Sequence, residues 1–229
     1  MRLPNAARQA LRRHVAQAVA RVDPGRYHQE PAYVAALFAR LDDVVYEGKS
    51  LKIEIRSTVV DDRGPGSAES IWGADFAIIA AIGALNETAE KAVLGQAKRG
   101  SLLSLSLNEV ERFRTQVTKM HVLTGAIVGL EVPTIRGEVP LIRVVDMAKA
   151  YGDTWAAASF ESAHRHYEKP ILGERQQGPP LLVSQPMSVE DYLDAELIRC
   201  LHGDNEPTVV ARMSQSSLKI LRVAVQQAP

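Results

Sequence analysis

The segment that most constrains the fold is the apolar run ADFAIIAAI at residues 74–82. Turn-forming residues stand on both sides of it, and Asp75 is its only charged residue. A short continuous apolar run with such boundaries is typical of a strand that is covered on both faces. We therefore expect a central β-sheet that is flanked by helices.

Three further segments have the patterns of strands. Residues 51–60, LKIEIRSTVV, alternate apolar and polar side chains, which is typical of a half-buried strand. Two more strands are predicted at residues 92–99, AVLGQAKR, and at residues 125–132, GAIVGLEV. Residues 140–150 predict either a fifth strand or the start of a helix. Residues 106–124 have apolar side chains at helical spacing, and Ser106 with Glu109 predicts a capping box at their start.

The order of these elements predicts an α/β fold with a mixed sheet. We expect hairpin-like connections among the first three strands and a helical crossover to the fourth. Towards the ends, helices are predicted at residues 5–21, at residues 32–48 and, capped by Ser188, at residues 188–203, whereas residues 207–225 fit a strand or a helix. The expected division is an N-terminal helical arm at 1–30, a core at 31–150 and a partly helical C-terminal extension at 151–229.

Composition excludes several classes of protein. The chain has 229 residues, of which 46% are hydrophobic, an ordinary fraction for a globular protein. No uninterrupted apolar run approaches the roughly 20 residues of a membrane-spanning helix. The single cysteine, Cys200, excludes an internal disulfide framework and a multi-cysteine zinc site. We expect a cytoplasmic protein without membrane association.

Charge is balanced overall but unevenly distributed. The net charge is zero, yet residues 1–26 carry six arginines against Asp23, and residues 188–207 carry six acids against Arg199. The basic segment could contact phosphates or form a solvated helix face, and the solvated face is the plainer interpretation.

Polar residues at two strand ends form the candidate site. Asp75 stands at the start of its strand, and Gln96 and Lys98 stand two residues apart at the end of the next. If the two strands pair antiparallel, these ends lie side by side, and residues at i and i+2 share one face of the sheet. Asp75, Gln96 and Lys98 are therefore expected to converge, with Arg99 on the opposite face.

These three residue types suit phosphodiester hydrolysis. A carboxylate such as Asp75 is a preferred ligand of Mg²⁺, which keeps several waters and takes few protein ligands. The Gln96 carbonyl and the backbone carbonyl between Gln96 and Lys98 could supply further oxygens. A lysine beside the metal can orient or deprotonate the attacking water, or offset charge on the phosphate.

The strand–loop–strand–turn–strand–helix–strand order with an Asp…Gln-x-Lys motif resembles the PD-(D/E)xK nuclease superfamily, and more narrowly its Mrr-like branch. The resemblance covers residues 31–132 and matches Asp75, Gln96 and Lys98 to the motif. It implies a restriction-endonuclease-like core and an endonuclease that uses Mg²⁺ or Mn²⁺, acting on DNA in defence or repair.

Other polar residues compete for supporting roles. Glu69 is the favoured fourth site residue, with helix capping or loop hydrogen bonding as its plainer role. The superfamily often supplies a glutamate from the first core helix, for which Glu47, Asp42 and Asp43 compete, whereas Glu54 has the pattern of a polar strand face. Gln116 and Lys119 lie one turn apart on the crossover helix, where they could touch the phosphate backbone or form solvated surface.

Alternatives remain at both the site and the functional level. His164 and His166 stand two apart but lack a third convergent ligand, so solvated side chains are the better interpretation. A catalytically inactive nuclease-fold module is the alternative function, with its charged ends docking a partner protein or nucleic acid. The weak net charge suggests that substrate affinity comes from a homodimer, a partner subunit or the N-terminal arm.

Overall fold

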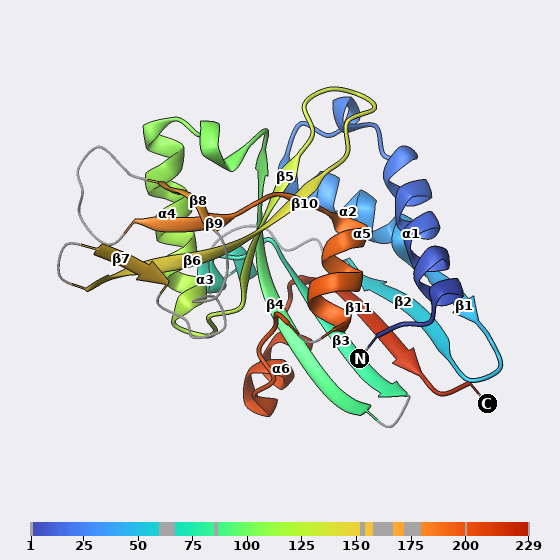
Figure 1. Cartoon of the computed structure of the whole chain (residues 1–229). Coiled ribbons are helices and arrows are strands. Elements are labelled where there is room, and N and C mark those ends of the chain that lie inside the picture. The colour runs from blue at the N-terminus through green and yellow to red at the C-terminus, as the bar shows by residue number, and fades with distance from the viewer. Residues whose placement is uncertain are drawn as a thin grey trace.

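A computed structural model of the whole chain shows an α/β fold with a large mixed sheet flanked by helices (Figure 1). The structure describes residues 2–59, 67–84, 87–151, 154–157, 167–171, 180–199 and 201–228. Within these ranges eleven strands form the sheet, in the order β1-β2-β11-β3-β4-β5-β6-β9-β8, and β7 and β10 pair with β6 outside this order. No helix in these ranges has the length and apolar character needed to cross a membrane.

The strands are β1 Asp43–Glu47, β2 Lys52–Thr58, β3 Phe76–Ala84, β4 Glu87–Arg99, β5 Ile127–Val132, β6 Leu141–Tyr151, β7 Thr154–Ala157, β8 Tyr167–Ile171, β9 Leu181–Ser184, β10 Met187–Ser188 and β11 Lys219–Gln226. The helices are α1 Asn5–Ala20, α2 Glu30–Leu41, α3 Ala68–Trp72, α4 Leu107–His121, α5 Val189–Asp191 and α6 Pro207–Ser214. A π-helical segment, η3 Tyr192–Ile198, continues α5, and short 3-10 turns occur at Pro24–Arg26 (η1) and Leu102–Ser104 (η2).

The central part of the sheet follows the predicted order. Strands β3 and β4 pair antiparallel, α4 then crosses over, and β5 pairs parallel to β4. The predicted capping box is present at the start of α4, where the Ser106 N–H donates to Glu109 Oε2 at 2.9 Å. Residues 140–150 form a strand, β6, and not a helix.

Alternating side chains divide the core into two layers, one on each face of the sheet. Phe76 and Ile78 of β3 pack with α1, α2 and η3, whereas Ala77 and Ile79 pack with α4 and α6. Figure 1 shows α1 and α2 on one side of the central strands and α4 on the other. Both layers bury apolar surface, which explains why β3 is apolar on both faces.

The C-terminal strand β11 corrects the predicted topology. It lies between β2 and β3, antiparallel to β2 and parallel to β3, so the hairpin-like connection expected between residues 51–60 and 74–82 is wrong. The ambiguous segment 207–225 contains both predicted structures, α6 followed by β11. The expected core boundary at residue 150 falls within β6, and a strand from the expected C-terminal extension lies in the middle of the sheet.

The single helix predicted at residues 32–48 is also wrong, because α2 ends at Leu41 and residues Asp43–Glu47 form β1. Strand β1 contains two valines and a tyrosine, which favour a strand. Asp42 fixes the change of direction, because its Oδ2 accepts from the Ser57 N–H at 2.7 Å and from Ser57 Oγ at 3.1 Å.

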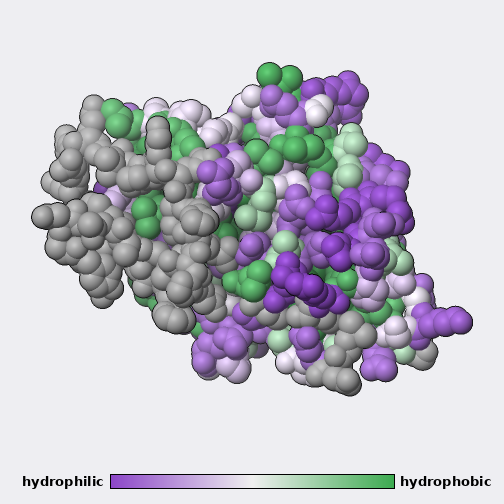
Figure 2. All heavy atoms as spheres, viewed as in Figure 1, coloured by the Kyte–Doolittle hydropathy of each residue, from purple (hydrophilic) through white to green (hydrophobic). Residues whose placement is uncertain are grey.

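The charged ends of the chain contact each other. Arg12 of α1 lies 2.6 Å from Asp191 and 3.6 Å from Asp194, and Arg8 lies 3.7 Å from Asp194. Figure 2 shows hydrophilic residues gathered over the side of the molecule where α1 lies. Part of the predicted basic and acidic surfaces is therefore used within the chain. The N-cap predicted at Ser188 is present at the start of α5, because Ser188 Oγ accepts from the Asp191 N–H.

His164, His166 and Cys200 lie outside the residues that the structure describes.

Candidate active site

Strand β4 extends past the start of its neighbour β3, and this overhang creates the site. Phe76, the first residue of β3, pairs with Gly95, so the residues from Gln96 onward have no strand partner on that side. On their other side they continue to pair in parallel with β5. Gln96 and Lys98 share the face that α4 covers, as their spacing predicts.

The Asp75 side chain closes the open edge of β4. Its backbone N–H donates to the Gly95 carbonyl at 2.8 Å, and its Oδ2 accepts from the Ala97 N–H at 2.9 Å. The same oxygen accepts from Gln96 Nε2 at 2.5 Å. Asp75 is 4% exposed and Gln96 is 2% exposed. The predicted meeting of Asp75 and Gln96 is therefore present, in a site that water barely reaches.

The environment of Asp75 favours its protonated form. Burial raises the pKa of Asp75 to about 7, and the charge of Glu69 adds to this increase. The Ala97 hydrogen bond and the charges of Lys98 and Lys219 act in the opposite direction on this pKa. A carboxyl group that exchanges its proton near neutral pH is characteristic of functional sites.

Lys98 reaches the site from its rim. Its Nζ donates to Gln116 Oε1 at 2.9 Å and lies 5.9 Å from the centre of the Phe113 ring. Burial lowers the pKa of Lys98, although the charge of Asp75 opposes this shift. No hydrogen bond or ion pair joins these two described residues. Lys98 therefore acts on Asp75 through its charge and not through contact.

Glu69 belongs to the same network through Gln116. Gln116 Nε2 donates to Glu69 Oε1 at 3.1 Å, and Arg112 donates to the same oxygen at 3.4 Å. Gln116 is 7% exposed, so it is not a solvated residue of the helix surface. It bridges Glu69 of α3 to Lys98 of β4 and fixes both side chains relative to α4.

Helix α3 is held against α4 immediately before Asp75. Gly73 ends α3 with a φ of 75°, and a Cβ there would lie 2.4 Å from the Gln116 carbonyl oxygen. Only glycine permits both this backbone conformation and this approach. The exposed Lys119 adds a second link, because its Nζ donates to the Ser70 carbonyl at 3.0 Å. Lys119 thus positions α3 and does not reach Asp75.

Three charged residues near the site were not predicted from the sequence. The charges of Glu30, in the first turn of α2, and of Arg112 act on the pKa of Lys98, and that of Lys219 acts on the pKa of Asp75. Arg112 lies one turn before Gln116, so helical spacing could have identified it. Glu30 and Lys219 come from distant segments, and no local pattern connects them to the site.

The other acidic candidates lie at the β1–β2 edge of the sheet. Asp42 bonds to Ser57, and this backbone hydrogen bond lowers the pKa of Asp42. Asp43 and Glu47 are exposed on β1, which lies two strands beyond β11. Glu54 makes ion pairs with lysine and arginine neighbours on β2, as a polar strand face does. These four residues do not join the Asp75 network.

The site contains oxygen atoms of the types that bind Mg²⁺ or Mn²⁺, although Gln96 turns its nitrogen towards Asp75. Gln96 Oε1 is buried without a hydrogen-bond partner, which is costly unless a ligand or ion satisfies it. The Asp75 carboxylate lies against the same amide, and the Ala97 carbonyl lies 3.5 Å from Gln96 Nε2. Rotation of the Gln96 amide would direct its oxygen towards the carboxylate. Because Mg²⁺ keeps several waters, one carboxylate with neutral oxygens suffices.

The site is not a multi-residue metal cage. Among the described residues, no group of three or more histidine, cysteine or acidic side chains comes together to hold an ion. The arrangement combines one carboxylate, one unsatisfied amide oxygen and one partly buried ammonium, which can bind a phosphate oxygen and polarise a water molecule.

Comparisons with known proteins found no family model, no curated protein and no solved structure that matches this chain. Its function must therefore be inferred from the site itself.

Proposed function

We propose that the chain is a metal-dependent nuclease that hydrolyses phosphodiester bonds in DNA, in a restriction-like defence or DNA-repair setting. The observation that carries the proposal is the contact between Asp75 and Gln96 beside a Gln96 oxygen that is buried without a partner. The crossover of α4 between the parallel strands β4 and β5 supports it, because the PD-(D/E)xK resemblance implies this arrangement.

Each side chain has a role that follows from its position. Asp75, Gln96 Oε1 and the Ala97 carbonyl would hold Mg²⁺ or Mn²⁺, which supplies Lewis acidity and a more acidic bound water. Lys98 lies at the rim of the site with a lowered pKa, where it would offset charge on the phosphate or accept a proton from the attacking water. Gln116 and Glu69 orient Lys98 by hydrogen bonding and charge.

The proposal predicts how cation binding depends on pH. Metal ligands must be deprotonated, and the pKa of Asp75 is raised to about 7. Cation affinity should therefore increase as the pH rises through about 7. The free amine of Lys98 also becomes more abundant as the pH rises.

Cleavage of plasmid and single-stranded DNA in Mg²⁺ or Mn²⁺ tests the proposal. Asp75→Ala and Lys98→Ala should each reduce the cleavage rate by roughly a hundredfold or more, as the loss of an electrostatic catalytic group does. Asp43→Ala and Lys49→Ala are matched controls, because they remove the same charges at exposed positions away from the site.

Cation binding gives a readout that does not depend on cleavage. Mg²⁺ should raise the melting temperature of the wild type at about pH 8 and leave that of Asp75→Asn unchanged. The proposal is wrong if folded wild type cleaves neither DNA in either metal and shows no metal-dependent stabilisation.

A binding module on the same fold is the second candidate. It is favoured by the closed state of the site, in which the Asp75 oxygen is already bonded to Ala97 and Gln96. DNA binding that is unaffected by metal, by Asp75→Ala and by Lys98→Ala would support this candidate over the nuclease.

A further inference from the structure

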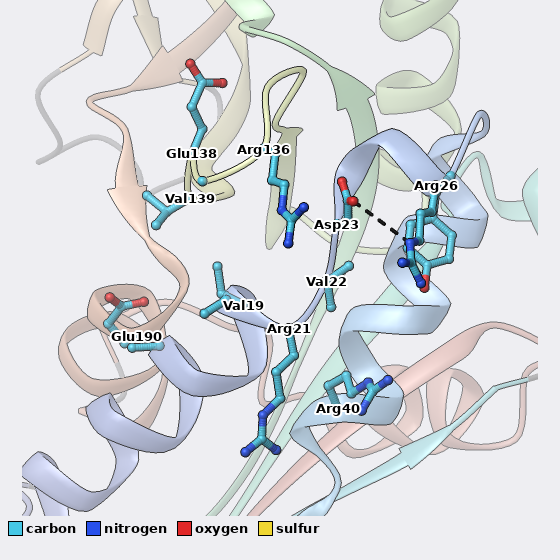
Figure 3. Close-up of a pocket in the computed structure, with 14 residues that line it drawn as sticks. Val19, Arg21, Val22, Asp23, Arg26, Arg40, Arg136, Glu138, Val139 and Glu190 are labelled. Atoms are coloured by element: carbon cyan, nitrogen blue, oxygen red, sulfur yellow. Dashed lines mark ion pairs between the residues drawn. The ribbon is translucent and has the colours of Figure 1, made fainter.

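A polar cavity lies on the face of the sheet opposite to α4, between the end of α1, η1, α2 and the connection from β5 to β6 (Figure 3). Its volume is about 530 Å³. Four arginines line it: Arg21, Arg26, Arg40 and Arg136. Arg21 and Arg26 lie close together in the sequence, whereas Arg40 and Arg136 come from two other segments, so only the folded protein brings all four together.

Three carboxylates, Asp23, Glu138 and Glu190, also line the cavity, so its lining has one more basic than acidic side chain. Arg26 lies 3.9 Å from Asp23. Within the described part of the chain, Arg21, Arg40 and Arg136 have no carboxylate within ion-pair distance. In Figure 3 the Arg136 guanidinium points from its connection into the space beside α1, whereas Glu138 points away from it. The cavity therefore presents guanidinium groups that are available to an anion.

Part of the remaining wall is apolar. Val19, Val22 and Val139 line the cavity together with Tyr27. Small-molecule sites combine such apolar walls with a few polar groups, in volumes of roughly 300–1,000 Å³. Guanidinium groups bind phosphate oxygens with two parallel hydrogen bonds, which makes arginine the preferred partner of phosphate esters.

We propose that this cavity binds a phosphate-bearing ligand of nucleotide size. The phosphates lie on Arg136 and Arg40, and the less polar part of the ligand lies against the valines and Tyr27. A free nucleotide and one or two residues of a nucleic-acid strand share this chemistry.

The cavity is distinct from the Asp75 site but structurally connected to it. Arg99, next to Lys98 in β4, donates to the Tyr27 carbonyl from the face opposite to α4. Glu30 lies three residues beyond Tyr27, and its charge raises the pKa of Lys98. Ligand binding in the cavity requires no catalysis, so the proposal stands whether or not the Asp75 site cleaves DNA.

Isothermal titration calorimetry of the full chain in EDTA tests the proposal with three probes: pyrophosphate, ADP and a short single-stranded oligonucleotide. Arg136→Ala and Arg40→Ala should each weaken binding by about tenfold, because each removes a charge-assisted hydrogen-bonding group. Arg13→Ala is the matched control, since Arg13 is exposed on α1 and does not line the cavity.

The three probes identify the source of the phosphate. Binding of ADP that depends on Arg136 and Arg40 supports the proposal and assigns a free nucleotide, and binding of the oligonucleotide alone with the same dependence supports it and assigns a nucleic-acid strand. Binding of pyrophosphate alone overturns the nucleotide-sized ligand. The proposal is also overturned if no probe binds folded wild type at millimolar concentration, or if Arg13→Ala weakens binding as much as the cavity variants do.

Discussion

Replacing Asp75 with asparagine should stabilise the protein at alkaline pH in the absence of divalent cations. Asp75 is almost fully buried, and burial raises its pKa to about 7 from an ordinary value of 3.8. Its ionised form is therefore less favourable in the folded chain than in the unfolded one. Asparagine has nearly the same shape and carries no charge. Its amide oxygen can accept from the Ala97 N–H and from Gln96 Nε2, as Asp75 Oδ2 does in the wild type.

The sign and size of the stability difference between Asp75→Asn and the wild type follow from proton linkage. A group whose folded pKa is raised contributes stability that is complete below its unfolded pKa and is lost as the pH rises through its folded pKa. The difference between the folded pKa of about 7 and the ordinary pKa of 3.8 corresponds to about 4 kcal/mol of folding stability. The wild type loses this stability as the pH rises from roughly 4 to 8. At about pH 8 the asparagine variant should therefore be more stable by up to that amount, or roughly 10 °C in melting temperature.

Urea unfolding in EDTA at several pH values between about 4.5 and 8 measures this difference. Asp42→Asn is a control of opposite sign, because the Ser57 backbone hydrogen bond lowers the pKa of Asp42. Asp42 stabilises the fold above its unfolded pKa, so its variant should be less stable than the wild type at about pH 8. The reasoning about Asp75 is refuted if Asp75→Asn is no more stable than wild type at that pH, or if the difference between them does not grow with pH.

Two further substitutions test how the site is supported. A Cβ at Gly95 would lie 2.1 Å from the ring of the buried Phe76, so Gly95→Ala should lower the free energy of unfolding by about 3 kcal/mol in chemical denaturation. A Cβ at Gly83 meets nothing within 4 Å, so the control Gly83→Ala should change it by less than about 1 kcal/mol. Equal effects of the two substitutions would contradict this packing argument. Arg143 Nε donates to Glu131 Oε1 at 2.7 Å, and both residues are buried. Arg143→Ala should lower the free energy of unfolding by about 3–5 kcal/mol, because it leaves the buried Glu131 charge uncompensated. A change near zero in the same assay would show that this pair does not hold the β5–β6 end of the sheet.

Much of the Asp75 site could be predicted because its signals are local. Two-residue spacing places Gln96 and Lys98 on one face, and an antiparallel pair places Asp75 beside Gln96. The network around Lys98 was less predictable. Gln116 was recognised as a helix residue near the site, but its burial and its bridge to Glu69 depend on how α3 packs against α4.

The sequence by itself determined the strands around the site and the capped helix that crosses over to the next strand, because apolar periodicity and capping residues act over a few neighbouring positions. Tertiary structure alone decided that β11 inserts between β2 and β3, which brings Lys219 towards Asp75. It also decided that four separate arginines surround one cavity. Such pairings depend on which apolar faces cover each other when distant segments meet, and local patterns do not encode that choice.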